Sequence, residues 1–351
     1  MQSVQSLEIT PEILNLIAEI DEFKGAWRAL GNLAPEALLR LQKVATIESI
    51  ASSTRIEGSK LSDRQVEQLL LNLKVQKFDT RDEQEVAGYA ELMNTIFQHY
   101  SDIPLSENFL LQLHGLLMKY SDKDQWHKGT YKQLPNHVVA TDADGKQIGV
   151  VFETASPLET PEKMRELVDW TQQALAEGRL HPLLVIGIFI LCFLAIHPFQ
   201  DGNGRLSRAL TTYLLLKAGY RYVPFSSLEA IIEQEKQAYY LSLRQTQTTL
   251  NLAQTNWLPW LLFFLKSLKR QKDNLEIKVS REHILLTQMP ELAQQILEIV
   301  QSRGRITIGE LERLTNANRN TLRKNLENLV QNRRLQQNGV GKGTWYSLAF
   351  N

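Results

Sequence analysis

Hydrophobic residues recur every three or four positions along most of the 351-residue chain, which is the period of a helix that buries one face. Between residues 11 and 29, for example, Ile13, Ile17 and Ile20 fall on one side of a predicted helix. The stretch 182–196 is instead apolar on all sides, which predicts a helix at the centre of a domain. The expected helices cover residues 11–29, 35–50, 62–73, 82–100, 107–120, 161–176, 182–196, 204–218, 228–246 and 257–269. The pattern therefore predicts a mainly α fold.

Two regions depart from this helical pattern. Between residues 129 and 154, β-prone positions such as Val139 and Val150 flank a turn-forming Asp-Ala-Asp-Gly run, which predicts a small β-hairpin flap. Near the C-terminus, apolar positions predict three short helices, followed by two β segments around the glycine-rich run 339–343. This order resembles a winged helix-turn-helix domain.

Composition narrows the classes of protein to consider. A chain of this length with 43% hydrophobic residues can bury two or three cores. Lysine plus arginine equals aspartate plus glutamate at 39 each, so no global charge directs it to nucleic acid or a membrane. The single cysteine, Cys192, lies in an apolar run and is expected to be a buried hydrophobe. The N-terminus lacks a secretion signal, and the run 183–196 is shorter than the roughly 20 residues of a membrane span, so we expect a cytoplasmic protein without a membrane contact.

The segment that follows the apolar helix carries the features of a phosphate cradle. Gly202 and Gly204 allow backbone conformations and close approaches that other residues do not. A helix that begins near Gly204 would add the positive end of its dipole. Arg205 and Arg208 lie three apart on that helix, so both guanidinium groups could bind polyphosphate oxygens.

Three other residues of this segment add chemistry. Asp201 is a hard oxygen ligand of the kind that Mg²⁺ takes together with substrate phosphates. Asn203 can donate its amide to a phosphate oxygen. His197 is suited to remove a proton from an attacking hydroxyl. Each feature alone is commonly structural, but their combination within twelve residues predicts a catalytic site.

The run from His197 to Arg208, His-Pro-Phe-Gln-Asp-Gly-Asn-Gly-Arg-Leu-Ser-Arg, resembles the signature of the Fic family at every specified position. The resemblance implies a helical core, His197 as general base and Asp201 as the Mg²⁺ ligand. It also implies an anion hole of Gly202, Asn203, Gly204 and Arg205, with Arg208 at the γ-phosphate. The implied reaction is protein adenylyltransfer, in which a Ser, Thr or Tyr hydroxyl of a target protein takes AMP from ATP. A Doc-like kinase would carry lysine at position 204, which disfavours phosphorylation.

The run from Ser53 to Gly58 lies near the end of a predicted helix, where Gly58 fits a helix stop. It is similar to the inhibitory helix of the Fic subclass that carries this element before the signature. The resemblance implies that Glu57 pairs with Arg208 and blocks the productive pose of ATP, with support from Ser53. In some relatives the same glutamate assists AMP removal, so a hydrolytic activity stays open.

A Tyr-Tyr pair at Tyr239 and Tyr240 falls on a predicted helix where Fic proteins carry such a pair near the adenine. Aromatic pairs on helices are more often part of a core, so both interpretations stay open. The predicted flap corresponds to the hairpin that in the family adds the target segment as a further strand.

The winged-helix region between Arg303 and Lys342 holds nine basic and three acidic residues, a local excess of six positive charges. Arg319, Asn320 and Arg323 on its third helix could contact DNA. Contacts with protein, or a structural cap, are an equal alternative for residues 286–351.

These patterns predict an N-terminal helical region with the inhibitory helix at 1–104, a Fic core at 105–270, a linker at 271–285 and a winged-helix domain at 286–351. The leading function is an autoinhibited protein adenylyltransferase. The alternatives are a DNA-binding regulator with a nucleotide-sensing Fic domain, and removal of AMP or another phosphotransfer. Self-modification and a homodimer are also left open by the sequence.

Overall fold

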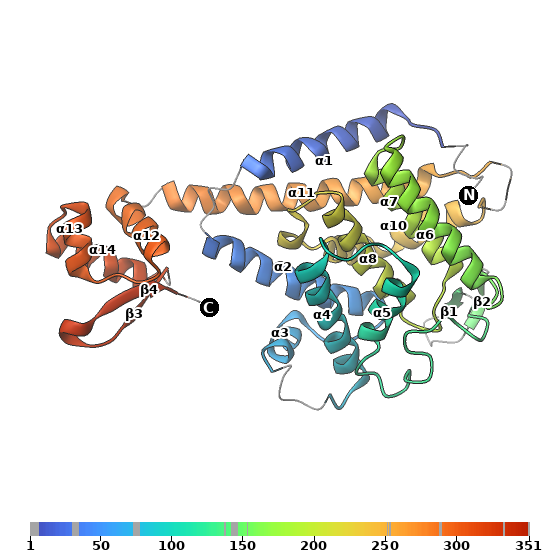
Figure 1. The fold of residues 1–351 in the computed structure, drawn as a ribbon, viewed down its shortest axis with the longest axis horizontal. Helices are drawn as coiled ribbons and strands as arrows, with labels where there is room; N and C mark the ends of the chain where they lie inside the picture. Colours follow the sequence, from blue (N-terminus) through green and yellow to red (C-terminus); the bar gives the residue numbers. More distant parts are fainter. Residues whose placement is uncertain are drawn as a thin grey trace. The chain divides into compact units, whose positions relative to one another are not determined.

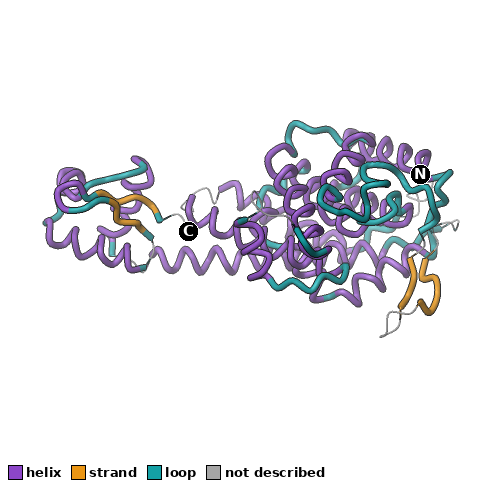
Figure 2. The backbone as a smooth tube through the Cα atoms, turned by 90° about the horizontal axis from the view of Figure 1, so that it is seen from below, coloured by secondary structure: helices purple, strands orange, loops and turns teal. Residues whose placement is uncertain are grey.

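The computed structural model describes residues 7–29, 35–72, 78–136, 138–141, 147–152, 154–250, 252, 254–287, 290–332 and 334–349. The chain forms two compact units, one of residues 1–31 and 42–274 and one of residues 32–41 and 275–351. Figure 2 shows that helices make up most of the described chain and that strands are confined to two hairpins. The predicted mainly α fold is therefore confirmed.

The helices that lie wholly or partly in the first unit are drawn in Figure 1, where all of them except α9 carry labels. They are α1 (Pro11–Ala29), α2 (Pro35–Ile56), α3 (Asp63–Leu71), α4 (Arg81–His99), α5 (Glu107–Leu117), α6 (Thr160–Glu177), α7 (Pro182–Ile196), α8 (Asn203–Lys217), α9 (Leu228–Gln234), α10 (Lys236–Gln247) and α11 (Leu258–Thr287). The residues of α2 and α11 divide between the two units.

Helix α7 is the central helix of its unit, as its uniformly apolar sequence predicts. All of its residues from Leu183 to Ile196 are buried except Ala195, and it packs between α6 and α8 (Figure 1). Cys192 is 6% exposed, and burial raises the pKa of its thiol to about 12, so it behaves as a core residue. Among the described helices, none is sufficiently long and apolar to cross a membrane.

The predicted flap is an antiparallel hairpin of β1 (Val138–Thr141) and β2 (Gln147–Phe152), drawn in orange in Figure 2. Val139 pairs with Val150 in its register. The expected turn at 142–145 lies outside the described residues.

Two helices differ from the prediction. The single helix expected over 228–246 is broken at Glu235, between α9 and α10, where the backbone leaves the helical conformation with φ −108° and ψ 29°. The helix expected over 257–269 extends to Thr287 and includes all of residues 271–285. The boundary between the two units falls within this helix, after Asn274.

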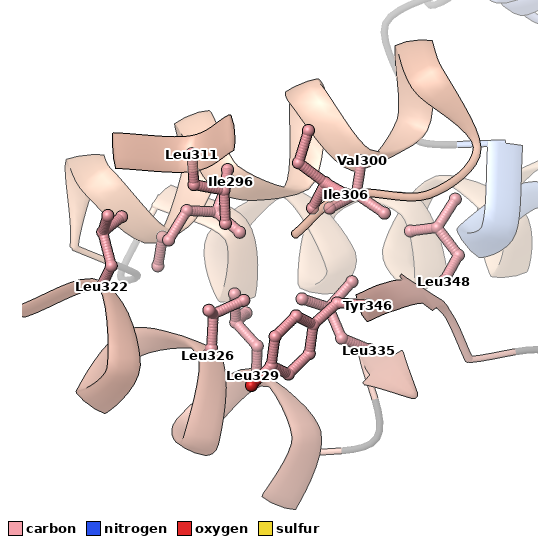
Figure 3. Close-up of a cluster of buried hydrophobic side chains, with 11 residues drawn as sticks. Ile296, Val300, Ile306, Leu311, Leu322, Leu326, Leu329, Leu335, Tyr346 and Leu348 are labelled. Atoms are coloured by element: carbon pink, nitrogen blue, oxygen red, sulfur yellow. The ribbon is translucent and has the colours of Figure 1, made fainter. Parts of the chain in front are cut away.

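The second unit contains α12 (Glu291–Arg303), α13 (Ile308–Thr315), α14 (Arg319–Gln331), β3 (Leu335–Asn338) and β4 (Trp345–Leu348). Its helices and hairpin bury one apolar cluster, which includes Leu311, Leu322 and Leu326 (Figure 3). A bridge between Ile306 and Tyr346 adds a further backbone pairing to the hairpin. The elements follow the predicted order of a winged helix, and that assignment stays a prediction.

Candidate active site

The loop between α7 and α8, together with the start of α8, holds most of the predicted site residues. Helix α7 ends at Ile196 and α8 begins at Asn203, so six residues turn the chain back between two packed helices. Gly202 makes the turn possible: its φ is +81°, and a Cβ there would lie 2.3 Å from Cε of Met118. The side chain of Asn203 closes the loop, because its Oδ1 accepts from the backbone N–H of Phe199 at 2.9 Å and its Nδ2 donates to the carbonyl of Phe199 at 2.6 Å.

The imidazole of His197 is held in one tautomer. Its Nδ1 lies 3.3 Å from the carbonyl oxygen of Leu194. Because a carbonyl only accepts, this contact places the proton on Nδ1 and leaves Nε2 with a free lone pair. Burial lowers the pKa of His197 to about 4. The side chain is therefore an unprotonated base at neutral pH.

Asp201 belongs to a network of alternating charges. Its Oδ1 accepts from the backbone N–H of Gly202 at 2.6 Å and from Nη2 of Arg205 at 3.3 Å, and its Oδ2 lies 3.3 Å from Nη2 of Arg81. Glu85 pairs with both arginines. Burial opposes ionisation, but Arg205, the Gly202 amide and Arg81 outweigh it and hold the pKa of Asp201 below its ordinary value.

Arg208 is 3% exposed and points toward the end of α2 rather than to the Arg205 network. Its Nη2 donates to Oε1 of Glu57 at 2.8 Å and to the carbonyl of Ser53 at 2.9 Å, and its Nε donates to Oγ of Ser53 at 2.9 Å. Burial opposes both charges, yet each partner stabilises the other, so the pKa of Glu57 is lowered and that of Arg208 is raised. Gly58 follows with a φ of +109°, a conformation that suits glycine where the helix ends.

The Glu57 carboxylate also lies over the N-terminus of α8. A Cβ built on Gly204 would meet Oε1 of Glu57 at 2.1 Å. Helix N-termini bind anions, so this carboxylate fills the place of an anionic ligand. The Nη1 atom of Arg208 is buried without a hydrogen-bond partner among the described residues and lies 3.3 Å from the same Cβ position. The cradle thus keeps one unused donor for an anion.

A cavity of about 430 Å³ joins these groups to helix α10. Its described lining consists of Glu57, Leu194, His197, Gln200, Asp201, Gly202, Asn203, Gly204, Arg208, Tyr239, Tyr240, Leu243, Arg244 and Gln247. Tyr239 is only 3% exposed because it packs on Trp260 and Phe263, whereas Tyr240 is 42% exposed. One ring thus lies mainly in the core and the other is open to solvent, and since both line the cavity, the nucleotide-binding role of the pair stays a prediction.

The structure adds residues that the sequence analysis did not single out. Arg244 and Gln247 line the cavity one and two turns beyond the tyrosines, and an i, i+4, i+7 pattern from Tyr240 could have indicated them. Arg81 reaches Asp201 across 120 positions of sequence, which no local pattern predicts. His114 is fully buried, with Nε2 3.1 Å from the carbonyl of Asp201 and Nδ1 accepting from Gly129.

Residues 104–215 match the Fic/DOC family model. Two curated relatives are named protein adenylyltransferase Fic. The one from Drosophila willistoni is 25% identical over 232 residues, which are 65% of this chain and 42% of the relative. The one from Drosophila virilis is 24% identical over 306 residues, which are 82% of this chain and 57% of the relative. The chain thus spans about half the length of these curated relatives.

Two solved structures extend the likeness to the fold. A Fic family protein from Desulfovibrio desulfuricans G20 superimposes with a TM-score of 0.64 and 25% identity, covering 99% of this chain and 98% of that one. A Fic domain containing signaling protein from Bacteroides thetaiotaomicron VPI-5482 gives a TM-score of 0.61 and 27% identity over 75% and 97%. The loop, the helices α5 to α8 and these likenesses agree: residues 104–215 form a Fic/DOC family domain.

Proposed function

We propose that the protein is an adenylyltransferase that moves AMP from ATP to a Ser, Thr or Tyr hydroxyl of a target protein. The observation that carries this proposal is the cavity, which joins an unprotonated His197, the N-terminus of α8 and the guanidinium of Arg208 to a partly aromatic wall on α10. A base, a phosphate cradle and a partly aromatic wall in one cavity are the parts that nucleotidyl transfer needs.

In the proposed reaction, Nε2 of His197 takes the proton of the target hydroxyl while its oxygen attacks the α-phosphorus of ATP. A new oxygen–phosphorus bond forms, the bond from the α-phosphorus to the bridging oxygen breaks, and pyrophosphate leaves. The N–H groups at the start of α8 and Arg208 would neutralise the phosphate charge that develops. The products are the target O-AMP ester and pyrophosphate.

Asp201 is the residue that would hold Mg²⁺. Among the described residues, no group of three or more His, Cys, Asp or Glu could form a complete metal site. One ionised carboxylate beside a phosphate cradle instead fits a Mg²⁺ that is shared with substrate phosphates and waters. The ion would neutralise phosphate charge. Arg81, which is 56% exposed, is the mobile partner that would give way.

Glu57 would act as a brake. It occupies both Arg208 and the α8 N-terminus, so the terminal phosphate of ATP can reach its proposed place only after this carboxylate leaves. The kinase alternative is disfavoured because position 204 holds glycine rather than the lysine of Doc-like kinases. Removal of AMP by water aligned on Glu57 is retained as a secondary activity, detected as AMP released from modified target.

The test uses ATP labelled at the α or the γ phosphate, with Mg²⁺, in wild type, Glu57→Gly and His197→Ala proteins, scored on the chain itself and on added proteins. We expect α label to become covalent, more strongly with Glu57→Gly and not at all with His197→Ala. Transfer of γ label instead would refute AMP transfer. Nucleotide binding without covalent product in every variant would favour the nucleotide-sensing alternative.

A second activity, DNA binding by the C-terminal unit, is supported by the solvent-facing side of α14. Arg319, Asn320, Arg323 and Lys324 are all exposed there, although Arg319 is paired with Glu312 at 3.2 Å. Two other predicted cations, Arg333 and the side chain of Lys342, lie outside the described residues. The full chain should bind a 30-base-pair duplex in a salt-sensitive way, measured by fluorescence anisotropy.

The matched variants for this second activity are Arg323→Ala and Arg179→Ala. Arg323 lies on α14, whereas Arg179 is an exposed arginine of the first unit. Loss of binding with Arg323→Ala alone supports a DNA surface on α14. Equal effects of both variants, or no binding at 50 mM salt, would indicate that the unit serves protein contacts.

A further inference from the structure

The catalytic loop is braced by a short segment that lies immediately before the hairpin. Four consecutive carbonyl oxygens, from Ile196 to Phe199, accept hydrogen bonds from two residues of this segment. Nζ of Lys132 donates to Ile196 at 3.0 Å and its backbone N–H to Pro198 at 2.8 Å. Nδ2 of Asn136 donates to His197 at 3.3 Å and to Phe199 at 2.5 Å. Each carbonyl of this run therefore accepts a hydrogen bond from outside the loop.

The Lys132 ammonium joins this brace to both ends of the hairpin. The residue is 3% exposed, and Nζ uses all three of its protons: besides Ile196 it donates to Oδ1 of Asn136 at 2.7 Å and to Oγ1 of Thr154 at 3.0 Å. Asn136 precedes β1 and Thr154 follows β2. A buried ammonium persists only where hydrogen bonds replace its water, so the position of the hairpin ends and that of the loop are tied through one atom.

The brace matters because His197 has an unfavourable backbone conformation. Its φ is +53°, and of the described non-glycine residues only His197 and Asn316 have a positive φ. The backbone of a residue with a Cβ adopts this left-handed conformation only at a cost in energy, so contacts with its surroundings must stabilise it there. The contact of Nδ1 with Leu194 depends on this backbone geometry, and with it the lone pair on Nε2.

We infer that Lys132 and Asn136 are positioning residues that hold His197 in its base-competent geometry and link it to the hairpin. The inference rests on the proposed function only where it states that His197 deprotonates a target hydroxyl. The effect of Lys132 and Asn136 on the geometry of His197 does not depend on that function. Lys132 and Asn136 contact neither Gly204 nor Arg208. Their loss should therefore reduce turnover without weakening ATP binding.

The test compares Lys132→Met and the isosteric Asn136→Asp in the Glu57→Gly background. The control is Lys123→Met, which removes an exposed lysine from the loop that follows α5; among the described residues, this lysine has no hydrogen bond to the catalytic loop. We expect each brace variant to lower kcat for AMP transfer at least tenfold, while the Kd of ATP measured by calorimetry changes less than twofold. The control should retain full kcat. Should Lys132→Met fail to fold, Asn136→Asp decides, since it keeps an acceptor for Lys132 but replaces the donor to the loop by a negatively charged oxygen that the loop carbonyls repel.

A second readout does not require catalysis. Two-dimensional NMR of ¹⁵N-histidine protein, with the His197 signals assigned by His197→Ala, reports the imidazole tautomer. We expect a pure Nδ1–H form in the parent and a mixture of tautomers in the brace variants. If AMP transfer is absent altogether, this experiment still tests the brace, so the two failures are distinguishable. Unchanged kcat and unchanged tautomer, or a parallel loss of ATP affinity, would overturn the inference.

Discussion

Replacing Glu57 by glycine is the perturbation that tests the proposed brake most directly. The carboxylate accepts a 2.8 Å hydrogen bond from Nη2 of Arg208, and its side chain is 32% exposed. A charge-assisted hydrogen bond of this kind contributes about 1.5–3 kcal/mol. Since about 1.4 kcal/mol is a factor of ten, the productive pose of ATP should gain roughly 10- to 150-fold in Glu57→Gly.

The same change should cost stability when no nucleotide is present. Removing one partner of a fully buried ion pair typically costs about 3–5 kcal/mol, and the partly exposed Glu57 side chain should reduce this figure. We expect the lower end here, because the two bonds from Arg208 to Ser53 remain. Each kcal/mol corresponds to about 2–4 °C of Tm for a unit of this size. ATP at about 100 times its Kd would restore roughly 2.7 kcal/mol.

The assays are calorimetry of ATP with Mg²⁺, thermal unfolding with and without ATP, and transfer of α label. Glu57→Gln is the matched control, because it keeps the size and one acceptor but loses the charge, and it should fall between wild type and Glu57→Gly in all three assays. A Glu57→Gly protein with the ATP affinity and transfer rate of wild type would refute the reasoning. A Tm that ATP does not raise would show that the vacated place is not a phosphate site.

Three further predictions concern other parts of the same site. Arg55, near the end of α2, donates from Nε and Nη2 to the two carboxylate oxygens of Glu233 at 2.6 and 2.9 Å, which holds the inhibitory segment in place. Arg55→Met should therefore raise AMP transfer severalfold in wild type but not in Glu57→Gly, and a loss of rate in both backgrounds would contradict a role through Glu57. Burial lowers the pKa of His197 to about 4, so the acidic limb of kcat/KM should fall near pH 4 rather than near the free value of about 6.5, and a limb at 6.5 would argue against a buried base. Gln247 is 8% exposed and lines the cavity on the α10 side, so Gln247→Leu should raise KM for ATP about tenfold with little change in kcat and should reduce the preference for ATP over GTP; an unchanged preference would place the base elsewhere.

The low pKa of a buried histidine also makes stability depend on pH. His114 is fully buried, and its Nδ1 accepts a hydrogen bond, so it folds as the neutral form with a pKa of about 4 against about 6.5 when unfolded. The unfolded chain then binds more protons between these two values, so the free energy of unfolding should fall as the pH drops from 6.5 to 4. His114→Gln should flatten this part of the curve, measured by urea unfolding; an equally steep curve would contradict the assignment.

The sequence determined the local parts of the protein. The three-to-four periodicity predicted the helical fold, the uniformly apolar run predicted the central helix α7, and the valine pattern predicted the hairpin. The glycine-rich loop was also predictable, because glycine is the residue type that tolerates the positive φ at position 202 and the close approach at position 204. Periodicity did not predict the break between α9 and α10 or the extension of α11 to Thr287.

Only the tertiary structure decided which distant groups share the site. Glu57 and Arg208 are 151 positions apart, and Lys132 reaches the carbonyl of Ile196 across 64. The pairing of a buried charge depends on which groups folding brings within about 3 Å of it and on how much water is removed there. Side-chain periodicity states which face of a helix is buried but not against which partner. The residue types of the loop could therefore be predicted from the sequence, whereas the Glu57–Arg208 pair, the contacts of Lys132 with the loop and the lowered pKa of His197 depend on the packed fold.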